Sequence, residues 1–427
     1  MKQKAEYMVA IDIGTTKTLA IVGRKDSHDK LEIIGIGSSP SVGVKRGVVI
    51  NIEETSKAIK SAVDNAFSTT DVEFAGAYVG IAGQHIKSVK NRGSRYIESP
   101  DFEITQSDVD GLNADMFKIP VEAGEKIIHV IPQSYIVDNE TGVKNPVGIS
   151  GKRLEANYHI VIGQIASARN VEKCVKRVGL EVVDLVLEPL ASAEAVLTDD
   201  EKEAGVVLID IGGGTTDVAV FYDGIIRHTA VIPFGGSVVT NDIKEGCSIL
   251  QRQAEQLKTQ FGSAMGELTE ENKIVSIPGI SGRKPKEISF RNLAYIIQAR
   301  MEEIVDAAYY EIENSGVADK LGAGIVLTGG GAMLKHLPEL VNLRTGLDVR
   351  VGFPETVLSK NSVKELNSTI YATGIGLLMK GFDHPKADDI IKPLMVMVEP
   401  EEPEIEEPDS PGLFGTIRRT ISKILDE

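Results

Sequence analysis

The chain has 427 residues, of which 42% are apolar and 25% charged, a composition that predicts two to four folded domains rather than a disordered or collagen-like chain. Its 62 acidic and 46 basic residues give a net charge of −16, which argues against a broad basic surface, so no nucleic-acid partner is expected. Two cysteines, Cys174 and Cys247, an N-terminus without a signal-peptide pattern and the lack of a run of about 20 apolar residues predict a cytoplasmic protein without a membrane-spanning helix.

The first part of the chain is predicted to fold as three strands, a helix and a further strand. The strands are expected at residues 7–13, 18–23, 31–37 and 74–82, and the helix at residues 52–67.

Residues 84–164 do not follow this order of elements and mix strand and helix patterns, so they are interpreted as an inserted α+β subdomain. Strand patterns occur at residues 126–137 and 157–162, and a helix is predicted at 106–116 with Thr105 as its N-cap. A helix at residues 168–176, capped by Ser167, and a strand at 181–187 are expected to follow.

From residue 206 onward, the order of elements predicted for residues 7–82 is repeated. Strands are predicted at residues 206–211, 217–222, 224–234 and 324–327, and helices at 239–246, 250–261, 290–314 and 369–380. After residue 384 the periodicity is lost, and residues 399–409 hold seven acids, three prolines and no base, which is typical of a solvated linker.

Two glycine-containing turns repeat at an interval of 198 residues. Asp12-Ile-Gly-Thr-Thr-Lys17 closes the first strand and Asp210-Ile-Gly-Gly-Gly-Thr-Thr-Asp217 closes its counterpart. Glycine lets backbone N–H groups approach a phosphate, and threonine hydroxyls and a lysine add donors. Either turn alone could be a plain strand connection, but two such hairpins facing each other would clamp one polyphosphate. The predicted phosphate contacts are Gly14, Thr15, Thr16, Lys17, Gly212, Gly213, Gly214, Thr215 and Thr216.

The two aspartates that open these motifs suit a metal better than a phosphate. Asp12 and Asp210 would repel a phosphate directly, whereas hydrated Mg²⁺ commonly uses one or two carboxylates and several waters. The sequence therefore predicts that both hold Mg²⁺ through water.

A third glycine-rich turn is a candidate for the nucleoside. Gly329, Gly330, Gly331 and Ala332 follow a predicted strand and are expected to open a helix at Met333, so that flat backbone and a helix N-terminus face the ligand. Glu255 and Lys258 lie three residues apart on one helix face and could hold a ribose. On spacing alone, a solvated helix face explains that pair equally well.

Together these motifs resemble the actin-fold ATPase superfamily. The resemblance implies an α/β fold of two lobes, which are duplicated copies of a ribonuclease-H-like unit, with ATP and Mg²⁺ between two hairpins. Residues 188–196 and 371–376 resemble its two connecting helices, where small residues would permit a close crossing. Glu188 falls where several relatives carry a residue that orients the attacking water, so Glu188 and Asp210 are the catalytic candidates. Glu188 could also be an acid that stabilises a helix start.

Four stretches are similar to the FtsA family of bacterial cell-division proteins in particular. They are Val44-Lys-Arg-Gly-Val-Val-Ile50, His129-Val-Ile-Pro-Gln-Ser-Tyr135, Val147-Gly-Ile-Ser-Gly-Lys-Arg-Leu-Glu155 and Ile232-Pro-Phe-Gly-Gly-Ser-Val-Val-Thr240. The resemblance implies an ATP-binding protein that polymerises and tethers FtsZ filaments to the cytoplasmic side of the cell membrane at the division site, where it recruits later divisome proteins. It implies at most a weak Mg²⁺-dependent ATPase.

The resemblance also gives a domain layout. Lobe 1 takes residues 1–83, 165–197 and 368–383, and the inserted subdomain takes 84–164. Lobe 2 takes residues 198–238 and 323–367 as its core and 239–322 as its small subdomain. Residues 384–411 form an acidic flexible linker and 412–427 an amphipathic membrane-binding helix.

In this family the C-terminal peptide of FtsZ binds partly through basic side chains on and before the long helix. The matching residues are Lys286, Arg291 and Arg300. A basic patch in a chain of charge −16 suits an acidic peptide, although ordinary solvated bases are an alternative for each residue.

The last sixteen residues have the pattern of a helix that lies in a membrane interface. Six apolar side chains fall within an arc of about 120°, and basic residues flank them. The segment is too short to span a bilayer but suits anionic lipids at its surface, although docking on the chain's own domain or on a partner is an alternative. The predicted membrane contacts are Leu413, Phe414, Ile417, Arg418, Arg419, Ile421, Lys423, Ile424 and Leu425.

Three other functions share the fold. An actin-fold kinase would need an acceptor pocket with a general base, for which no further carboxylate motif is visible. A chaperone ATPase would need a substrate-binding domain after residue 380, where only 47 residues remain. A pilus-assembly or cell-shape actin homologue stays possible, although the four FtsA-like stretches favour cell division.

Overall fold

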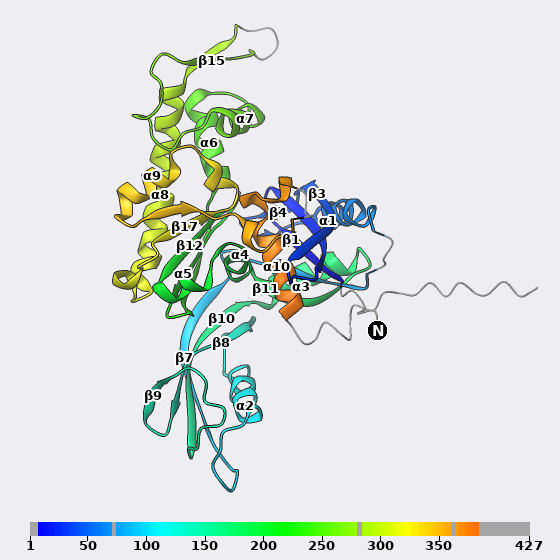
Figure 1. Cartoon of the computed structure of the whole chain (residues 1–427). Coiled ribbons are helices and arrows are strands. Elements are labelled where there is room, and N and C mark those ends of the chain that lie inside the picture. Colours follow the sequence, from blue (N-terminus) through cyan, green and yellow to red (C-terminus); the bar gives the residue numbers. More distant parts are fainter. Residues whose placement is uncertain (1–6, 71–73, 280–283, 361–363, 384–427) are drawn as a thin grey trace, which may run out of the picture. The chain divides into compact units, whose positions relative to one another are not determined.

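Two five-stranded sheets of the same topology form the body of the computed structural model, which describes residues 7–70, 74–279, 284–360 and 364–383 (Figure 1). The first has the order β11-β6-β1-β2-β3. β1 pairs antiparallel with β2 and parallel with β6. Its strands are β1 (Tyr7–Ile13), β2 (Lys17–Lys25), β3 (Leu31–Pro40), β6 (Gly76–Ile81) and β11 (Glu181–Leu187).

The second sheet repeats this arrangement with the order β14-β13-β12-β17-β18. β12 pairs antiparallel with β13 and parallel with β17. Its strands are β12 (Val206–Ile211), β13 (Thr216–Tyr222), β14 (Ile225–Ile232), β17 (Ile325–Thr328) and β18 (Val349–Val351). The predicted duplication is therefore present in the fold, and most predicted strands differ from the observed ones only by a few terminal residues.

The strand register makes the two hairpins strictly equivalent. Ile13 pairs with Thr18, and Ile211 pairs with Thr216, so each turn between paired strands has four residues. Thr18 is thus the counterpart of Thr216, and Lys17 that of Thr215. This register agrees with the 198-residue interval of the two motifs, and the Thr-Thr pairs are offset by two residues because the second motif has two more glycines before its threonines.

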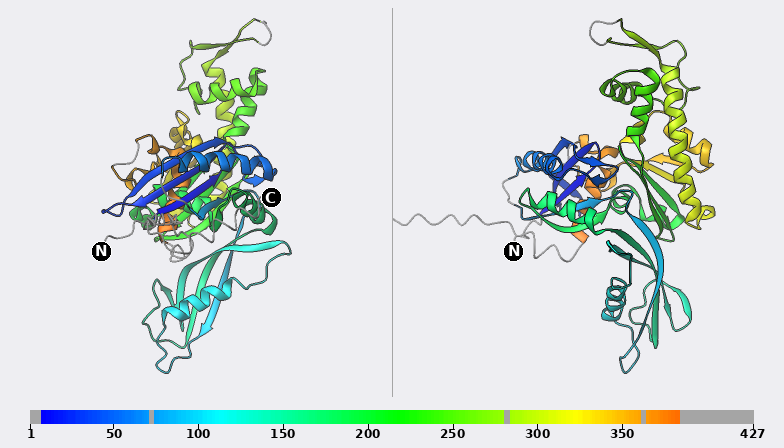
Figure 2. Two further views of the ribbon diagram at one scale, coloured as in Figure 1. Left: turned by 90° about the vertical axis from the view of Figure 1, so that its right-hand side faces the viewer. Right: turned by 180° about the vertical axis from the view of Figure 1, so that it is seen from behind.

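Helices cover the faces of the first sheet. α1 (Ile52–Phe67) lies across β2 and β3 and begins with Asn51, whose side chain accepts hydrogen bonds from Glu53 N and Glu54 N (Figure 2). α10 (Ala372–Asp383) packs on β1, β2 and β6 and against α4 (Glu188–Val196). The predicted helix at residues 369–380 is in fact a 3-10 helix (Thr369–Tyr371) that continues into α10.

The expected cap at Ser167 is wrong. Helix α3 (Ile165–Lys176) begins three residues before the predicted start, and Gln164 is its N-cap without a side-chain hydrogen bond. The preceding strand β10 (Arg153–Gln164) runs straight into the helix, so no capping turn separates them, and Ser167 is buried inside the helix.

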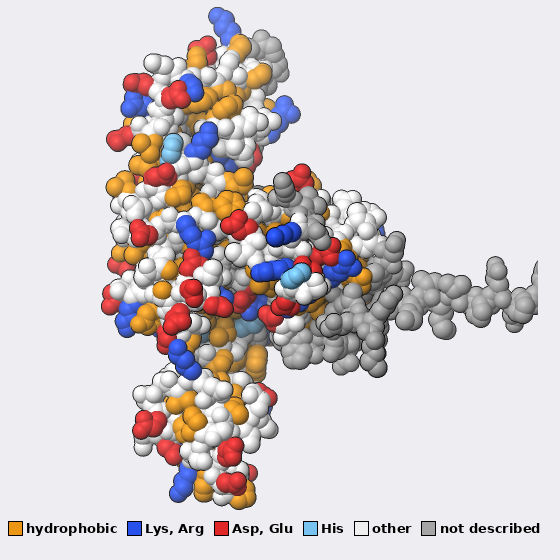
Figure 3. Space-filling view, viewed as in Figure 1, with side chains coloured by type: hydrophobic (Ala, Val, Ile, Leu, Met, Phe, Trp, Pro, Cys, Tyr) orange, Lys and Arg blue, Asp and Glu red, His pale blue; other side chains and the backbone are white. Residues whose placement is uncertain are grey.

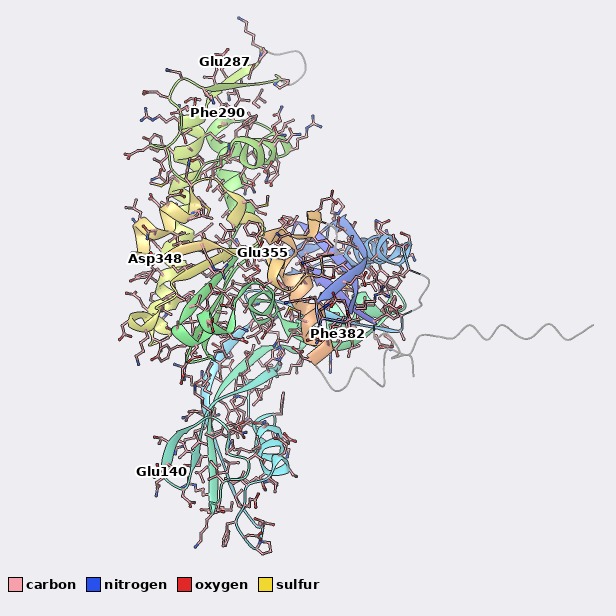
Figure 4. The ribbon with its side chains drawn as sticks, in the orientation of Figure 1. Glu140, Glu287, Phe290, Asp348, Glu355 and Phe382 are labelled. Carbon is pink, nitrogen blue, oxygen red and sulfur yellow. The ribbon has the colours of Figure 1, made fainter. Side chains whose placement is uncertain are left out.

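Helices of the second half pack around one extended core. Buried side chains of β12, β13 and α8 (Phe290–Asn314) belong to the same hydrophobic cluster. The other helices are α5 (Asp199–Ala204), α6 (Gly236–Cys247), α7 (Gln251–Phe261) and α9 (Leu337–Thr345), and a small sheet pairs β15 (Ile274–Ile277) with β16 (Lys286–Ser289). Phe290, at the start of α8, packs on Phe261 with ring centroids 5.1 Å apart (Figure 4).

The inserted segment has its own sheet and its own core. The strand order is β7-β10-β8-β9, formed by β7 (Lys87–Tyr96), β8 (Glu125–Val137), β9 (Glu140–Val143) and β10. Helix α2 (Gln106–Met116) packs on β7 and β8. As expected, Thr105 caps α2, and Asp108 completes a capping box. A separate hydrophobic cluster contains Leu112, Leu154 and Tyr158.

One predicted helix start is displaced. After β17 ends at Thr328, a 3-10 helix covers Gly330–Met333, and α9 begins only at Leu337. Gly329 has a φ of 81°, a conformation that favours glycine, and this turns the chain before a full helix can form. No α-helix therefore opens at Met333.

The predicted acidic linker and the amphipathic segment at 412–427 lie outside the described residues, and so do all nine predicted membrane contacts. Within the ranges that are described, no helix is both long enough and apolar enough to cross a bilayer.

Candidate functional site

The two glycine hairpins line one cavity of about 200 Å³. Residues Gly14 to Lys17 come from the first hairpin and Gly212 to Thr215 from the second, although they are far apart in the chain. Asp12, Glu188, Asp210, Gly329 and Gly330 line the same cavity. The structure thus brings together all but one of the predicted phosphate, metal and catalytic residues, the exception being Thr216.

The hairpins approach each other closely because one carries threonines where the other carries glycines. A methyl group on Gly213 would overlap the side chain of Thr16, and one on Gly214 would overlap that of Thr15. Thr15 Oγ1 also accepts a hydrogen bond from Gly47 N at 3.2 Å. Any larger side chain at Gly213 or Gly214 would push the hairpins apart.

A second, larger cavity of about 380 Å³ continues from the first. Thr16, Gly213, Gly330 and Ile370 line both. The larger cavity has more apolar walls, which include Val239, Met301, Met333 and Leu334. A small polar chamber that opens into a larger, partly apolar one matches the parts of a nucleotide in size and polarity.

Glu255 and Lys258 both line the larger cavity and are already paired. Lys258 Nζ lies 2.8 Å from Glu255 Oε2, and it donates to Thr240 Oγ1 at 2.8 Å and to Gly236 O at 2.9 Å. Thr240 in turn donates to Glu255. Glu255 and Lys258 are therefore part of a hydrogen-bonded polar wall of the larger cavity, in which Glu255 remains exposed.

Two predicted contacts fall outside both cavities. Thr216 is fully buried, and its hydroxyl donates to Phe234 O at 3.0 Å. Ala332 is also buried and lines neither cavity. For Thr216 the reason is the register: it is the first residue of β13 rather than a residue of the turn.

Carboxylates dominate the charge of the smaller cavity. Asp12, Glu188, Asp210 and Asp217 all line it, and Lys17 is the ammonium among its lining residues. Burial is the main reason why the pKa of each of the four carboxyl groups is raised, that of Asp12 to about 6. The neighbouring carboxylates add to this effect for Asp12, Glu188 and Asp217. Burial also lowers the pKa of Lys17.

This charge pattern fits a divalent cation together with a polyphosphate. A polyphosphate alone would meet repulsion from four carboxylates, whereas a cation between them would balance both sets of charges. Asp217 Oδ1 is buried and has no hydrogen-bond partner, which fits an oxygen that would contact a cation or its water. No cluster of three His, Cys, Asp or Glu side chains suited to direct metal ligation occurs among the described residues.

Several lining residues were missed by sequence reasoning. Thr369, Ile370 and Thr373 line the smaller cavity, and Lys17 Nζ donates to Ile370 O at 2.9 Å. They lie more than 350 residues from the first hairpin in the chain, so no local pattern marks them. Asp217 could have been found, because it ends the second copy of the repeated motif.

The three bases predicted to bind the FtsZ tail all have partners within the chain. Lys286 Nζ donates to Cys247 O at 2.6 Å, beside the end of α6, and Arg291 pairs with Glu271. Arg300 binds Asp242 through two nitrogens, at 2.6 and 3.2 Å. Glu287 is the neighbour of Lys286 on β16 (Figure 4), and Figure 3 shows acidic and basic side chains mixed over the visible face. An acidic peptide would therefore have to replace a backbone carbonyl at Lys286 and internal carboxylates at Arg291 and Arg300.

Comparison with known proteins gives a consistent result. The model of the family "Cell division protein FtsA" matches residues 207–376, and that of the "SHS2 domain inserted in FTSA" matches residues 83–162. The cell division protein FtsA of Pseudomonas aeruginosa is 41% identical over 379 residues, which cover 89% of this chain and 90% of that protein. FtsA of Neisseria meningitidis is 39% identical, with 88% and 91% covered, and FtsA of Escherichia coli K12 is 36% identical, with 88% and 90% covered.

Solved structures agree on the fold. The PilM–PilN type IV pilus biogenesis complex contains a chain with a TM-score of 0.62 at 14% identity, with 87% of this chain and 98% of that chain covered. MreB 5 of Spiroplasma citri bound to AMPPNP has a TM-score of 0.54 at 17% identity, with 89% and 97% covered. At these identities the likeness concerns the actin-like, two-lobed α/β architecture. The relatives above lead to one assignment: this chain, whose fold is actin-like, belongs to the FtsA family of cell division proteins.

Proposed function

We propose that this protein is a nucleotide-dependent adaptor of cell division that binds ATP with Mg²⁺ in its cleft. The observation that carries the proposal is the convergence of the two hairpins on one polar cavity that continues into a larger apolar one. The triphosphate would lie between Gly14–Lys17 and Gly212–Thr215, and the nucleoside would lie beside Glu255, Lys258 and the turn at Gly330 and Gly331. Bound AMPPNP in the MreB structure supports the same assignment.

Bound Mg²⁺ would supply positive charge that neutralises both the phosphates and the buried carboxylates. Asp12 and Asp210 would hold its waters, and Lys17 would exchange the Ile370 carbonyl for a phosphate oxygen. Glu188, at the first position of α4, would face the attacking water. Burial and the neighbouring carboxylates raise its pKa, so a smaller fraction of this carboxyl group is ionised at a given pH than for an exposed glutamate.

Calorimetric titration with ATP and Mg²⁺ tests this proposal. We expect binding by the parent chain and a loss of at least about tenfold in affinity for Gly213→Val, because the new side chain would collide with Thr16 between the hairpins. The matched control is Leu343→Ala on α9, an exposed side chain that is not among the residues lining either cavity. No heat with the parent, or an unchanged affinity in Gly213→Val, would refute the nucleotide site.

We further propose that the protein assembles into filaments and links FtsZ polymers to the cytoplasmic membrane, with later divisome proteins as additional partners. The amphipathic pattern of residues 412–427 and the acidic linker before it support membrane anchoring. A single tail of this size binds weakly, so many tails on one filament would be needed for firm attachment. Family membership supports the acidic FtsZ tail as the ligand of the region around Lys286, Arg291 and Arg300.

One reconstitution with anionic vesicles tests both links. We expect the full chain with ATP to sediment with the vesicles and to bring a labelled FtsZ C-terminal peptide with it, whereas a chain ending at Pro411 should stay in solution. Arg300→Ala should reduce peptide recruitment several-fold. Arg344→Ala is the control, because Arg344 likewise forms a bidentate pair with a carboxylate, Asp306 of α8. Sedimentation of the truncated chain, or equal recruitment by both variants, would contradict the respective link.

A further inference from the structure

Asp210 is the second-to-last residue of β12, and hydroxyl groups from two distant parts of the chain lie within hydrogen-bond distance of its carboxylate. Ser192 Oγ donates to Asp210 Oδ2 at 2.7 Å, and Thr373 Oγ1 lies 3.3 Å from the same oxygen. The two hydroxyls are 3.0 Å apart. Since each has a single proton, Ser192 donates to the carboxylate while Thr373 donates either to the carboxylate or to Ser192. Oδ2 therefore keeps a donor in either arrangement.

The opposite side of this carboxylate is also confined. A methyl group on Gly329 would overlap Asp210 Oδ1, so the glycine at this position is needed to leave room for that oxygen. Asp210 is 7% exposed, and its carboxyl group lines the smaller cavity. Two hydroxyls on one oxygen and a glycine beside the other thus fix the orientation of the group toward the cavity.

The two hydroxyls belong to the two helices that connect the lobes. Ser192 lies on α4 and Thr373 on α10, and the helices cross so closely that a methyl group on Gly376 would overlap the carbonyl of Ala191. Both helices appear side by side in Figure 1. Ser192 follows Ala191 directly, and Thr373 precedes Gly376 by one helical turn. Any relative movement of α4 and α10 would therefore disturb the hydrogen bonds to Asp210.

We propose that Ser192 and Thr373 are positioning residues that orient the Asp210 carboxylate toward the cation of bound Mg–ATP, so that the crossing of α4 and α10 sets how strongly Mg²⁺ promotes nucleotide binding. The inference rests on the proposed function, and it assigns to the connecting helices a role in metal recognition. Hydroxyls that occupy Oδ2 leave the lone pairs of Oδ1 available for the cation or its water.

The test compares ATP affinity with Mg²⁺ and with EDTA, using the full chain and a fluorescent ATP analogue. For the parent we expect much tighter binding with Mg²⁺. Ser192→Ala should reduce this gain about tenfold, the size expected for the loss of one hydrogen bond to a charged group, while the affinity in EDTA stays within about twofold. Thr373→Val, which keeps the shape of threonine, should reduce the gain about threefold because its contact is longer.

Thr373→Ser is the control, because it retains the hydroxyl and should bind like the parent. It also separates a positioning role from a packing role, since it loses a methyl group that valine keeps. The inference is overturned if Ser192→Ala and Thr373→Val weaken binding equally in Mg²⁺ and in EDTA, or if neither changes the Mg²⁺ gain. If the parent binds no ATP at all, the proposed function fails as well, and this result is distinct from the other two.

Discussion

At the scale of single residues, Asp217 shows how the cavity is built for a ligand at the expense of stability. It is 4% exposed, its Oδ1 has no hydrogen-bond partner, and burial and the charge of Asp210 raise its pKa well above the usual value. A carboxyl group whose pKa is raised in the folded state lowers the free energy of unfolding at any pH at which the same group is ionised in the unfolded chain. The sequence marks Asp217 as the end of a repeated motif, but its burial follows from the packing of the whole cleft and could not be predicted.

We expect Asp217→Asn to stabilise the ligand-free protein by about 1 kcal/mol or more. Because the pKa of Asp217 is raised in the folded state, the parent loses stability as pH rises above the unfolded pKa near 4, so the advantage of asparagine should grow between about pH 4 and pH 6. Urea unfolding at the two pH values measures this.

Asp223→Asn provides the comparison for this prediction. Asp223 is an aspartate of the neighbouring turn whose pKa is lowered by Lys144, so the same substitution there should bring no gain. If the parent is as stable as Asp217→Asn at both pH values, the buried carboxyl group does not lower the free energy of unfolding, and the prediction is wrong.

At the scale of elements, the crossing of α4 and α10 depends on the absence of side chains. The spacing of Ala372, Gly374 and Gly376 in the sequence predicted a close crossing, and the structure confirms it through the contact of Gly376 with Ala191. Local patterns of this kind, together with strand alternation and the hairpin motifs, made most of the fold predictable. The displaced start of α9 and the missing cap at Ser167 were not, because Gly329 and the direct passage from β10 into α3 override local propensity.

The two glycines of α10 should differ in their tolerance of alanine. A methyl group on Gly376 meets rigid backbone at Ala191, whereas one on Gly374 meets the ends of two flexible side chains, Ile21 and Leu19, at 2.8 and 2.9 Å. Gly376→Ala should therefore cost about 3 kcal/mol or more of unfolding free energy, and Gly374→Ala about 1 kcal/mol. Equal costs in urea unfolding would mean that the crossing can relax.

At the scale of the whole molecule, the inserted subdomain is bonded to both lobes. His129 of β8 accepts a hydrogen bond from Leu187 N, directly before Glu188, at 3.0 Å. On the other side, Gln133 donates to Ile226 O at 2.7 Å, and His159 contacts Thr229 at 2.8 Å, both on β14. A rotation between the lobes would have to break or shift these hydrogen bonds.

Acid should weaken the contact with β14. Burial, and to a smaller extent His228 and Lys90, lower the pKa of His159 to about 4. The neutral ring is therefore the folded form, and the stability it allows is present above about pH 6.5 and is lost as pH falls toward 4, by about 3 kcal/mol in total. Hydrogen exchange of β10 and β14 at about pH 7 and pH 5 measures the effect.

His159→Gln should remove most of this acid sensitivity, since glutamine can still bond to Thr229 but does not titrate. Replacing the exposed His28 by glutamine should change nothing in these strands. Unchanged acid sensitivity in His159→Gln would assign the effect to other groups.

The two hairpins, equal in length and register, have diverged into a matched pair rather than remaining copies. Where one has Thr15, Thr16 and Lys17, the other has Gly213, Gly214 and Thr215, and the small residues of one make room for the larger residues of the other. Two copies of the same hairpin could not form this cavity. Two copies of the first hairpin would bring threonine side chains into collision, and two copies of the second would leave an unfilled space between glycines. Lys17 adds an ammonium to the first hairpin, whereas Asp217 adds a carboxylate directly after the second, so the two hairpins differ in charge as well as in size.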